Sequence, residues 1–180
     1  SNGTLRDLIE KERLNLPTQD YDDTIKLIIS YGIASAMSYI HDNDIIHRDL
    51  KPANILIDDF MIPKVADFGI SKIRNNNDSF LQTNGNELKG SPCYMAPEIW
   101  ERNEYSKSSD VYAFGLILYE IFVNEPIFEN CFYFKIPFLL KKGYRPPFKK
   151  IINESLKNLI EQCWNNIPSE RPTFSEIKNQ

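Results

Sequence analysis

The sequence feature that most constrains this chain is the polar octapeptide HRDLKPAN at residues 47–54. β-Branched runs lie directly on either side of it, Ile45-Ile46 before and residues 55–57 after, and runs of this kind predict short strands. A loop between such strands holds its side chains in place better than an open surface does. Asp49, in the middle of the octapeptide, is therefore a candidate for chemistry that needs a fixed carboxylate.

A long helix is predicted immediately upstream. Its apolar positions follow the three-and-four spacing of one helical face, namely Ile25, Ile28, Ile29, Ile33, Ala36, Met37 and Ile40. Asp22 or Asp23 supplies the N-cap, and the turn-forming residues 42–44 end the helix. The octapeptide is thus expected to follow a helix and a two-residue strand.

A small antiparallel hairpin is predicted after the octapeptide. Asp58-Asp59 provides a turn, and residues 64–66 form a further short strand after Pro63. Asp67-Phe68-Gly69 follows that strand directly. Residues 74–90 are rich in Asn, Asp, Ser and Gly without helical or strand periodicity, which predicts a mobile loop inside the domain, and a loop this long usually serves function.

The second half of the chain is predicted to be helical. Residues 106–110 offer capping groups for an apolar helix at 111–123, and residues 156–164 repeat an amphipathic spacing. Thr173 and Glu176 resemble a capping box that opens a last helix, which we expect to be cut at Gln180. The pattern favours one mainly α-helical domain over residues 1–180 with a small hairpin.

Composition excludes several classes of protein. The net charge of -4 and pI of about 5.3 leave no excess of basic surface for a nucleic acid. Three scattered cysteines without CxxC spacing indicate reduced thiols and an intracellular, cytoplasmic location. The most apolar run, 111–123, is too short to span a bilayer and contains Glu120, so no membrane span is expected. Nothing in the composition indicates an oligomeric state.

Four side chains match the needs of phosphoryl transfer. That reaction requires a base that orients the acceptor, a cation near the transferred phosphate, and oxygen ligands for magnesium. Asp49 and Lys51 offer the base and the cation, while Asn54 and Asp67 offer the amide and carboxylate oxygens that Mg²⁺ prefers. The alternative is that these are ordinary surface charges.

At this point the sequence closely resembles the protein kinase family, in which HRDLKPAN is the catalytic loop and ADFG, here residues 66–69, is the metal-binding motif. The match continues through GSPCYMAPE at 90–98, SDVYAFG at 109–115, and Cys163-Trp164 with RPTF at 171–174. Order and spacing together make this signal far more specific than a lone tripeptide. Within the family, the motifs look most like the tyrosine-kinase-like group of serine/threonine kinases.

The resemblance implies an α+β kinase fold, and specifically its large C-terminal lobe with a small β-hairpin at the catalytic cleft. It also implies ATP and Mg²⁺ as cofactors and a protein substrate with Ser or Thr. Asp49 would accept the hydroxyl proton, Lys51 would balance charge on the γ-phosphate, and Asn54 and Asp67 would hold the metal. Leu56 would form the floor beneath adenine. Lys51 and Ser91 indicate serine/threonine rather than tyrosine specificity.

Other residues are structural by resemblance. His47 and Phe68 belong to a buried apolar column, with Gly69 completing the motif, and His41 is assigned no catalysis. Asp110 would anchor the backbone of the catalytic loop, for which a plain helix cap is the alternative. Glu98 and Arg171 would form an ion pair at the end of an activation segment spanning residues 67–98, for which two exposed charges are the alternative.

Regulation is expected at the activation segment. Arg48 directly precedes the base, and an arginine can grip a phosphate bidentately. Ser79 and Thr83 are the candidate phosphorylation sites, although either is equally readable as a solvated hydroxyl. Ser91 is assigned a structural and specificity role instead.

The small N-terminal lobe of a kinase is not found in the sequence. None of the seven glycines forms a GxGxxG array, and no strand lysine or helix glutamate precedes the catalytic loop in the family's order. We therefore expect the chain to be incomplete at both ends and inactive by itself. A kinase-like interaction module that never transfers phosphate, a pseudokinase or scaffold, is the competing interpretation.

Overall fold

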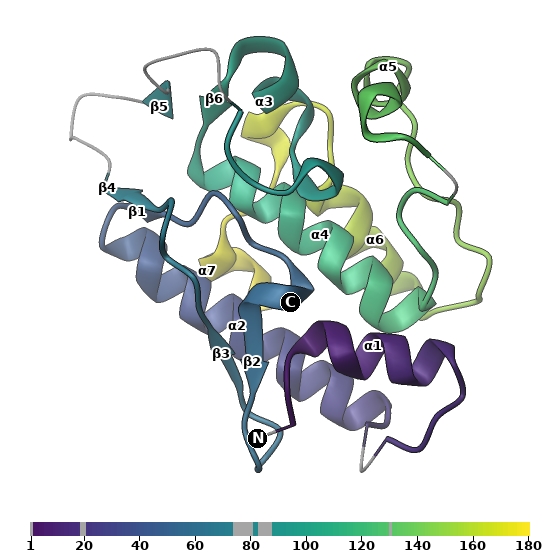
Figure 1. Cartoon of the computed structure of the whole chain (residues 1–180). Helices are drawn as coiled ribbons and strands as arrows, with labels where there is room; N and C mark the ends of the chain where they lie inside the picture. Colours follow the sequence, from purple (N-terminus) through teal and green to yellow (C-terminus); the bar gives the residue numbers. More distant parts are fainter. Residues whose placement is uncertain (1, 19–20, 74–80, 83–87, 130) are drawn as a thin grey trace.

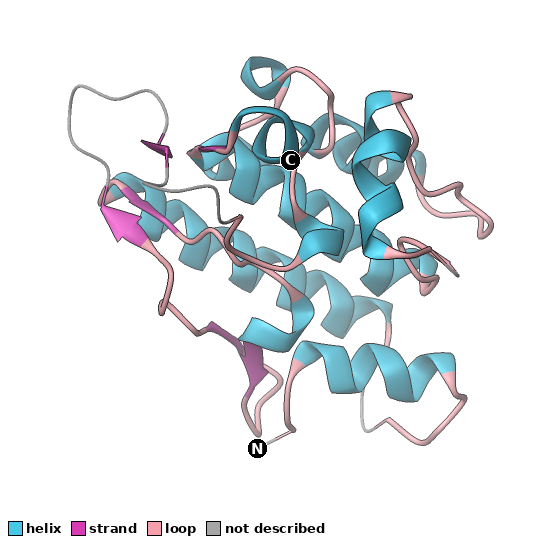
Figure 2. Cartoon of the chain, turned by 45° about the horizontal axis from the view of Figure 1, so that its top comes forward, coloured by secondary structure: helices cyan, strands magenta, loops and turns pink. Residues whose placement is uncertain are grey.

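The computed structural model describes residues 2–18, 21–73, 81–82, 88–129 and 131–180. Helices dominate these residues, and short strands gather at one side of the molecule (Figures 1 and 2). The helices are α1 Leu5–Arg13, α2 Asp23–Asp42, α3 Pro97–Arg102, α4 Lys107–Val123, α5 Ile136–Lys141, α6 Glu154–Cys163 and α7 Phe174–Ile177. The expectation of a mainly α-helical lobe with a small hairpin is confirmed.

Helix α4 is the centre of the core. Fourteen of its 17 residues are buried, as expected for a helix that is apolar on all sides. Helices α2 and α6 pack against it, and α6 comes closest at Gly115, where a β-carbon would lie 2.7 Å from Cβ of Cys163. The predicted start at residue 111 is wrong by one turn. Ser106 caps the helix and its capping box with Ser109 lies before the apolar run, so hydrophobicity alone does not mark the first residues.

The strands form three two-stranded antiparallel ribbons. They are β1 Ile45–Ile46 with β4 Lys72–Ile73, β2 Ile55–Ile57 with β3 Pro63–Val65, and β5 Leu81–Gln82 with β6 Glu104–Tyr105. The predicted hairpin is the β2–β3 ribbon, in which Ile55 lies opposite Val65. Strands β4, β5 and β6 were not predicted, because two residues are too few to show an alternation.

The N-terminal part of the chain packs against the β2–β3 hairpin, α1 against β2 and α2 against β3. Helix α1 begins with a capping box between Thr4 and Asp7, and Thr4 also forms a β-bridge with Leu56. Helix α2 begins and ends where the sequence predicted, with Asp22 as its N-cap. No helix in the described ranges is long and apolar enough to cross a membrane.

Candidate active site

The backbone of the octapeptide is bound to the core by one carboxylate. Asp110 lies in the first turn of α4 and is 2% exposed. Its Oδ2 accepts a hydrogen bond from the backbone N–H of His47 at 2.9 Å, and its Oδ1 accepts one from Arg48 at 3.0 Å. His41 Nε2 lies 2.9 Å from the same Oδ2. Asp110 is therefore a loop anchor, as the resemblance implied, and not a plain helix cap.

The carboxylate of Asp49 is positioned by two neighbours in the loop. Asn54 Nδ2 donates to the backbone oxygen of Asp49 at 2.8 Å and to Oδ2 at 3.1 Å. Lys51 Nζ donates to the same Oδ2 at 2.7 Å. Asp49 Oδ1 is buried and has no hydrogen-bond partner within the described parts of the chain. The contacts of Oδ2 thus orient the Asp49 carboxylate, while Oδ1 can still accept a hydrogen bond.

Lys51 also connects the loop to a segment forty residues later. Its Nζ donates to Ser91 Oγ at 2.7 Å, so the ammonium lies between Ser91 and Asp49. Gly90 permits this approach. It has a φ of +111°, and a β-carbon there would lie 2.7 Å from the carbonyl oxygen of Arg48. The structure therefore brings together the base, the cation and the hydroxyl that the motifs predicted.

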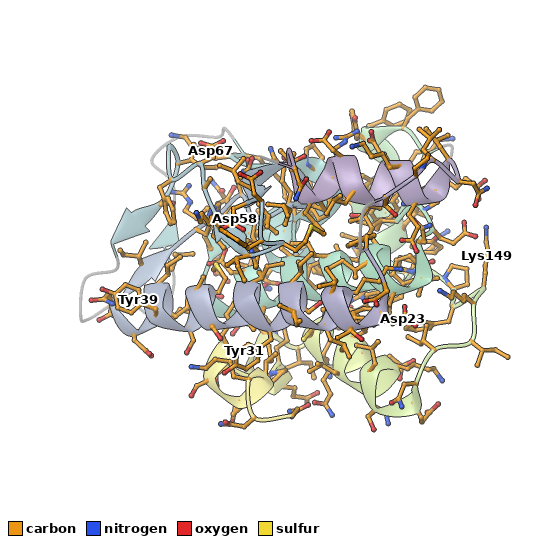
Figure 3. All side chains as sticks on the ribbon, turned by 90° about the horizontal axis from the view of Figure 1, so that it is seen from below. Asp23, Tyr31, Tyr39, Asp58, Asp67 and Lys149 are labelled. Atoms are coloured by element: carbon orange, nitrogen blue, oxygen red, sulfur yellow. The ribbon has the colours of Figure 1, made fainter. Side chains whose placement is uncertain are left out.

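The predicted metal ligands lie on neighbouring segments. The backbone N–H of Ala66 donates to the carbonyl of Asn54 at 2.9 Å, which joins the end of β3 to the catalytic loop. Asp67 follows with a left-handed φ of 61° and an exposed side chain, labelled at the rim of the molecule in Figure 3. Both donors on Asn54 Nδ2 point to Asp49, so its Oδ1 is left as an acceptor. Asn54 Oδ1 and the Asp67 carboxylate are thus oxygen groups of the kind that magnesium prefers as ligands.

Within the described residues, no group of three or more His, Cys, Asp or Glu side chains could hold a metal ion. Asn54 and Asp67 would hold a magnesium ion together with phosphate oxygens and water, which Mg²⁺ usually retains as ligands in nucleotide sites.

The predicted apolar column is only half buried. His47 is fully buried, and its ring lies 5.0 Å from that of Phe68. The expectation that Phe68 is also buried is wrong, because its side chain is 45% exposed. Among the described residues, its aromatic contact is with the His47 ring. Gly69 closes the motif, and its N–H points to Asp67 Oδ1 at 3.4 Å. Leu56 is also exposed, since it faces away from the buried Ile55 and Ile57.

Arg48 packs against Tyr105 of β6. Its guanidinium stacks over the ring of Tyr105 at 4.3 Å, and its backbone has a left-handed φ of 72°. The Nε and Nη2 atoms are buried without a hydrogen-bond partner among the described residues. Ser79 and Thr83, the candidate phosphorylation sites, lie outside the described residues. Tyr105 was missed because β6 is too short to be read from the sequence.

The ion pair between Glu98 and Arg171 is buried and bidentate. Arg171 Nη1 and Nη2 donate to the two carboxylate oxygens of Glu98 at 2.6 and 2.9 Å. The side chains are 0% and 5% exposed, so the alternative of two surface charges is excluded. The pair joins the start of α3 to the segment before α7, and Arg171 also donates to the backbone of Ser108.

A further carboxylate, the largely buried Glu120, was missed by sequence reasoning. Tyr94 donates through its hydroxyl to Glu120 Oε2 at 2.5 Å, which ties the end of the activation segment to α4. Burial raises the pKa of Glu120 above its ordinary value, and burial together with the nearby Glu120 raises the pKa of Tyr94. The available signal was that Glu120 is the single charge in the apolar run 111–123.

Comparisons with known proteins give matches over nearly the whole chain. Residues 1–180 match the family model of protein tyrosine and serine/threonine kinases. A probable LIM domain-containing serine/threonine-protein kinase of Dictyostelium discoideum is 40% identical over 98% of this chain and 26% of its own length. A putative serine/threonine-protein kinase/receptor of Acanthamoeba polyphaga mimivirus is 31% identical over 99% of the chain and 10% of its own length.

The name of a third relative states a broader specificity. It is a dual specificity protein kinase of Dictyostelium discoideum, 33% identical over 97% of this chain and 34% of its own length. The chain thus spans between about a tenth and a third of the length of these curated relatives.

Proposed function

The chain belongs to the protein kinase family, and we propose from this membership that it is the catalytic lobe of an enzyme that transfers the γ-phosphoryl group of ATP to Ser or Thr hydroxyls of proteins. The observation that supports the proposal most is the arrangement around Asp49. Lys51 and Asn54 both bind Oδ2, and Oδ1 is left with unused accepting capacity. A carboxylate in this state suits a group that accepts a proton from a substrate hydroxyl.

Each charged residue has a distinct role in this mechanism. Asp49 orients the acceptor hydroxyl and takes its proton as the oxygen attacks. Lys51 places a positive charge beside the base, where the transferred group carries its negative charge. Asn54 and Asp67 hold magnesium, which supplies charge neutralisation for the phosphates of ATP when bound. Leu56 offers an exposed apolar surface on β2 for the adenine ring.

Specificity for Ser and Thr is proposed from the contact between Lys51 and Ser91. This contact places a lysine and a small hydroxyl residue beside the base, the combination that resembles serine/threonine kinases. Two relatives are named serine/threonine-protein kinases, in agreement with this preference. A third is named a dual specificity protein kinase, so similar proteins also include a kinase of broader substrate specificity. We further propose the tyrosine-kinase-like group for this chain, on the motifs at residues 90–98 and 109–115.

Control by phosphorylation is proposed at Arg48. Two of its nitrogen atoms are buried and lack hydrogen-bond partners within the described ranges, which leaves donors available for a phosphate oxygen. A phosphate on Ser79 or Thr83 would supply such oxygens.

The decisive experiment is phosphotransfer from Mg-ATP to a Ser/Thr peptide by a longer protein that includes this chain and a nucleotide-binding lobe. Asp49→Asn should lower the rate by about 10²–10⁴-fold, because the amide cannot accept the proton. Asp42→Asn is the control, since Asp42 is an exposed carboxylate at the end of α2. Equal, measurable rates for the Asp49→Asn and unmodified proteins would overturn the role proposed for Asp49. No transfer by either protein would favour the interaction module instead.

A further inference from the structure

One buried tyrosine contacts the activation segment in two places. Tyr105 of β6 is 0% exposed. Its hydroxyl donates to the backbone oxygen of Lys89 at 2.7 Å and accepts from the backbone N–H of the same residue at 2.8 Å. Strand β5 of the activation segment also pairs with β6, with Leu81 opposite Tyr105 (Figure 1). A single residue thus binds the segment through its side chain and through its strand.

The ring of the same tyrosine packs on the catalytic loop. The guanidinium of Arg48 lies 4.3 Å from the centre of the Tyr105 ring, so the two groups form a cation–π stack. Arg48 directly precedes Asp49, and its backbone N–H donates to the buried Asp110 at 3.0 Å. The ring therefore lies against a residue whose backbone is already fixed to the core. Tyr105 joins Lys89 to that fixed part of the loop.

The two residues that follow Lys89 complete the connection to the catalytic cation. Gly90 packs so closely on the loop that a β-carbon there would lie 2.7 Å from the carbonyl oxygen of Arg48. Ser91 accepts a hydrogen bond from Lys51 Nζ at 2.7 Å. A shift of Lys89 would therefore be transmitted over two residues to the hydroxyl that contacts Lys51.

The position of Lys89 at the surface separates this contact from an ordinary core contact. Lys89 is an exposed residue, so water can replace the Tyr105 hydroxyl as the partner of its N–H and C=O groups. Removal of the hydroxyl should therefore release Lys89 without leaving an unsatisfied buried group, which keeps the loss of stability small. The main consequence is expected at the position of Ser91.

We propose that Tyr105 is a positioning residue for phosphoryl transfer, which holds Ser91 against Lys51 through the backbone of Lys89. The proposal rests on the proposed function, because the contact between Ser91 and Lys51 affects a rate only if phosphate is transferred. Tyr105 does not touch the reacting atoms. It fixes the distance between the catalytic loop and residues 89–91, and a small misplacement of catalytic groups lowers a rate steeply.

The test is phosphotransfer from Mg-ATP to a Ser/Thr peptide by the longer protein that includes a nucleotide-binding lobe. Tyr105→Phe removes the hydroxyl and keeps the ring. It should lower kcat/KM for the peptide about tenfold and leave KM for ATP unchanged within about twofold. Tyr119→Phe is the matched control, because Tyr119 is 1% exposed and its hydroxyl donates to the backbone oxygen of Pro147 at 2.9 Å, outside the site. Its kcat/KM should stay within about twofold of that of the unmodified protein.

Two further measurements connect Tyr105 to Ser91 and to Lys89. Because Tyr105 acts through Ser91, the double variant of Tyr105→Phe and Ser91→Ala should be no more than about twofold slower than Ser91→Ala alone. Hydrogen–deuterium exchange of the same longer protein should show the Lys89 amide exchanging about tenfold faster in Tyr105→Phe than in the unmodified protein or in Tyr119→Phe.

Four results would overturn the proposal. They are an unchanged kcat/KM for Tyr105→Phe, an equal loss for Tyr119→Phe, fully multiplicative effects of Tyr105→Phe and Ser91→Ala, and an unchanged exchange rate of the Lys89 amide. Failure of the proposed function gives a different result, because the unmodified protein would then transfer no phosphate. The exchange measurement needs no ATP, so it would still show whether Tyr105 holds Lys89.

Discussion

The two sides of the candidate active site differ in how firmly the surrounding residues fix their side chains. The side that carries Asp49 is built on buried charges, with Asp110 2% exposed beneath the loop and the Glu98–Arg171 pair farther back. The side that carries Asp67 is an exposed strand end with a left-handed backbone and a single long N–H contact from Gly69. The folded chain therefore determines the position of the base more tightly than that of the metal ligand.

This difference has a physical reason. A buried carboxylate that loses a partner leaves an uncompensated charge in a region of low dielectric constant, so its geometry resists change. An exposed carboxylate exchanges its partners for water at little cost. We infer that the position of Asp49 depends on the core, whereas that of Asp67 is only weakly fixed by the rest of the chain.

The largest effect on stability is expected for Arg171→Ala. The substitution leaves Glu98 buried without its bidentate partner, which should cost about 3–5 kcal/mol of unfolding free energy. Arg102→Ala is the matched control, because Arg102 is 51% exposed and its pair with Glu104 should contribute less than about 1 kcal/mol. Thermal melting of both variants checks this, and an unchanged midpoint for Arg171→Ala would refute it.

A direct test of the contrast compares Asp110→Ala with Asp67→Ala. Loss of Asp110 removes the acceptor of His47 and Arg48 N–H and should cost about 3 kcal/mol. Loss of the exposed Asp67 carboxylate should cost no more than about 1 kcal/mol, most of it from placing Ala at the left-handed φ of 61°. Urea unfolding of the 180-residue chain measures both. Equal losses of stability would show that the two sides are not held differently.

The smallest effect is expected from Glu120, a largely buried carboxylate with one short hydrogen bond. Because burial raises its pKa above the ordinary 4.5, the folded chain binds more protons than the unfolded chain between that pH and the raised pKa. Glu120 therefore contributes a loss of stability as the pH rises from 4.5 through the raised pKa. Glu120→Gln keeps an acceptor for Tyr94 and should remove this contribution.

Urea unfolding at a series of pH values measures that difference. The Glu120→Gln and unmodified chains should be closest in stability near pH 4.5, and the variant should become relatively more stable as the pH rises. Glu161→Gln, at an exposed position of α6, should follow the unmodified chain at every pH. A constant offset between Glu120→Gln and the unmodified chain would contradict the assignment.

Sequence reasoning was most successful where a pattern repeats or a motif is long. The bounds of α2, the β2–β3 hairpin and the Thr173 capping box were predicted because period, turn residues and caps agree locally. Helices α1, α3 and α5 were not predicted. Helices α3 and α5 have six residues each, too few to show a period, whereas the Thr4–Asp7 capping box was an available signal for α1. Strands β4, β5 and β6 have two residues each, and their pairing with distant segments leaves no local signal.

The sequence by itself determined the family, the order of the motifs and the chemical types at the site, because these depend on residue identity and spacing along the chain. Only the tertiary structure decided which atoms meet. Asp110 is 61 positions after Asp49 and Ser91 is 40 positions after Lys51, yet one anchors the loop and the other binds its cation. It also decided that Phe68 is exposed and that Glu120 is largely buried, since burial is set by what packs from elsewhere in the chain.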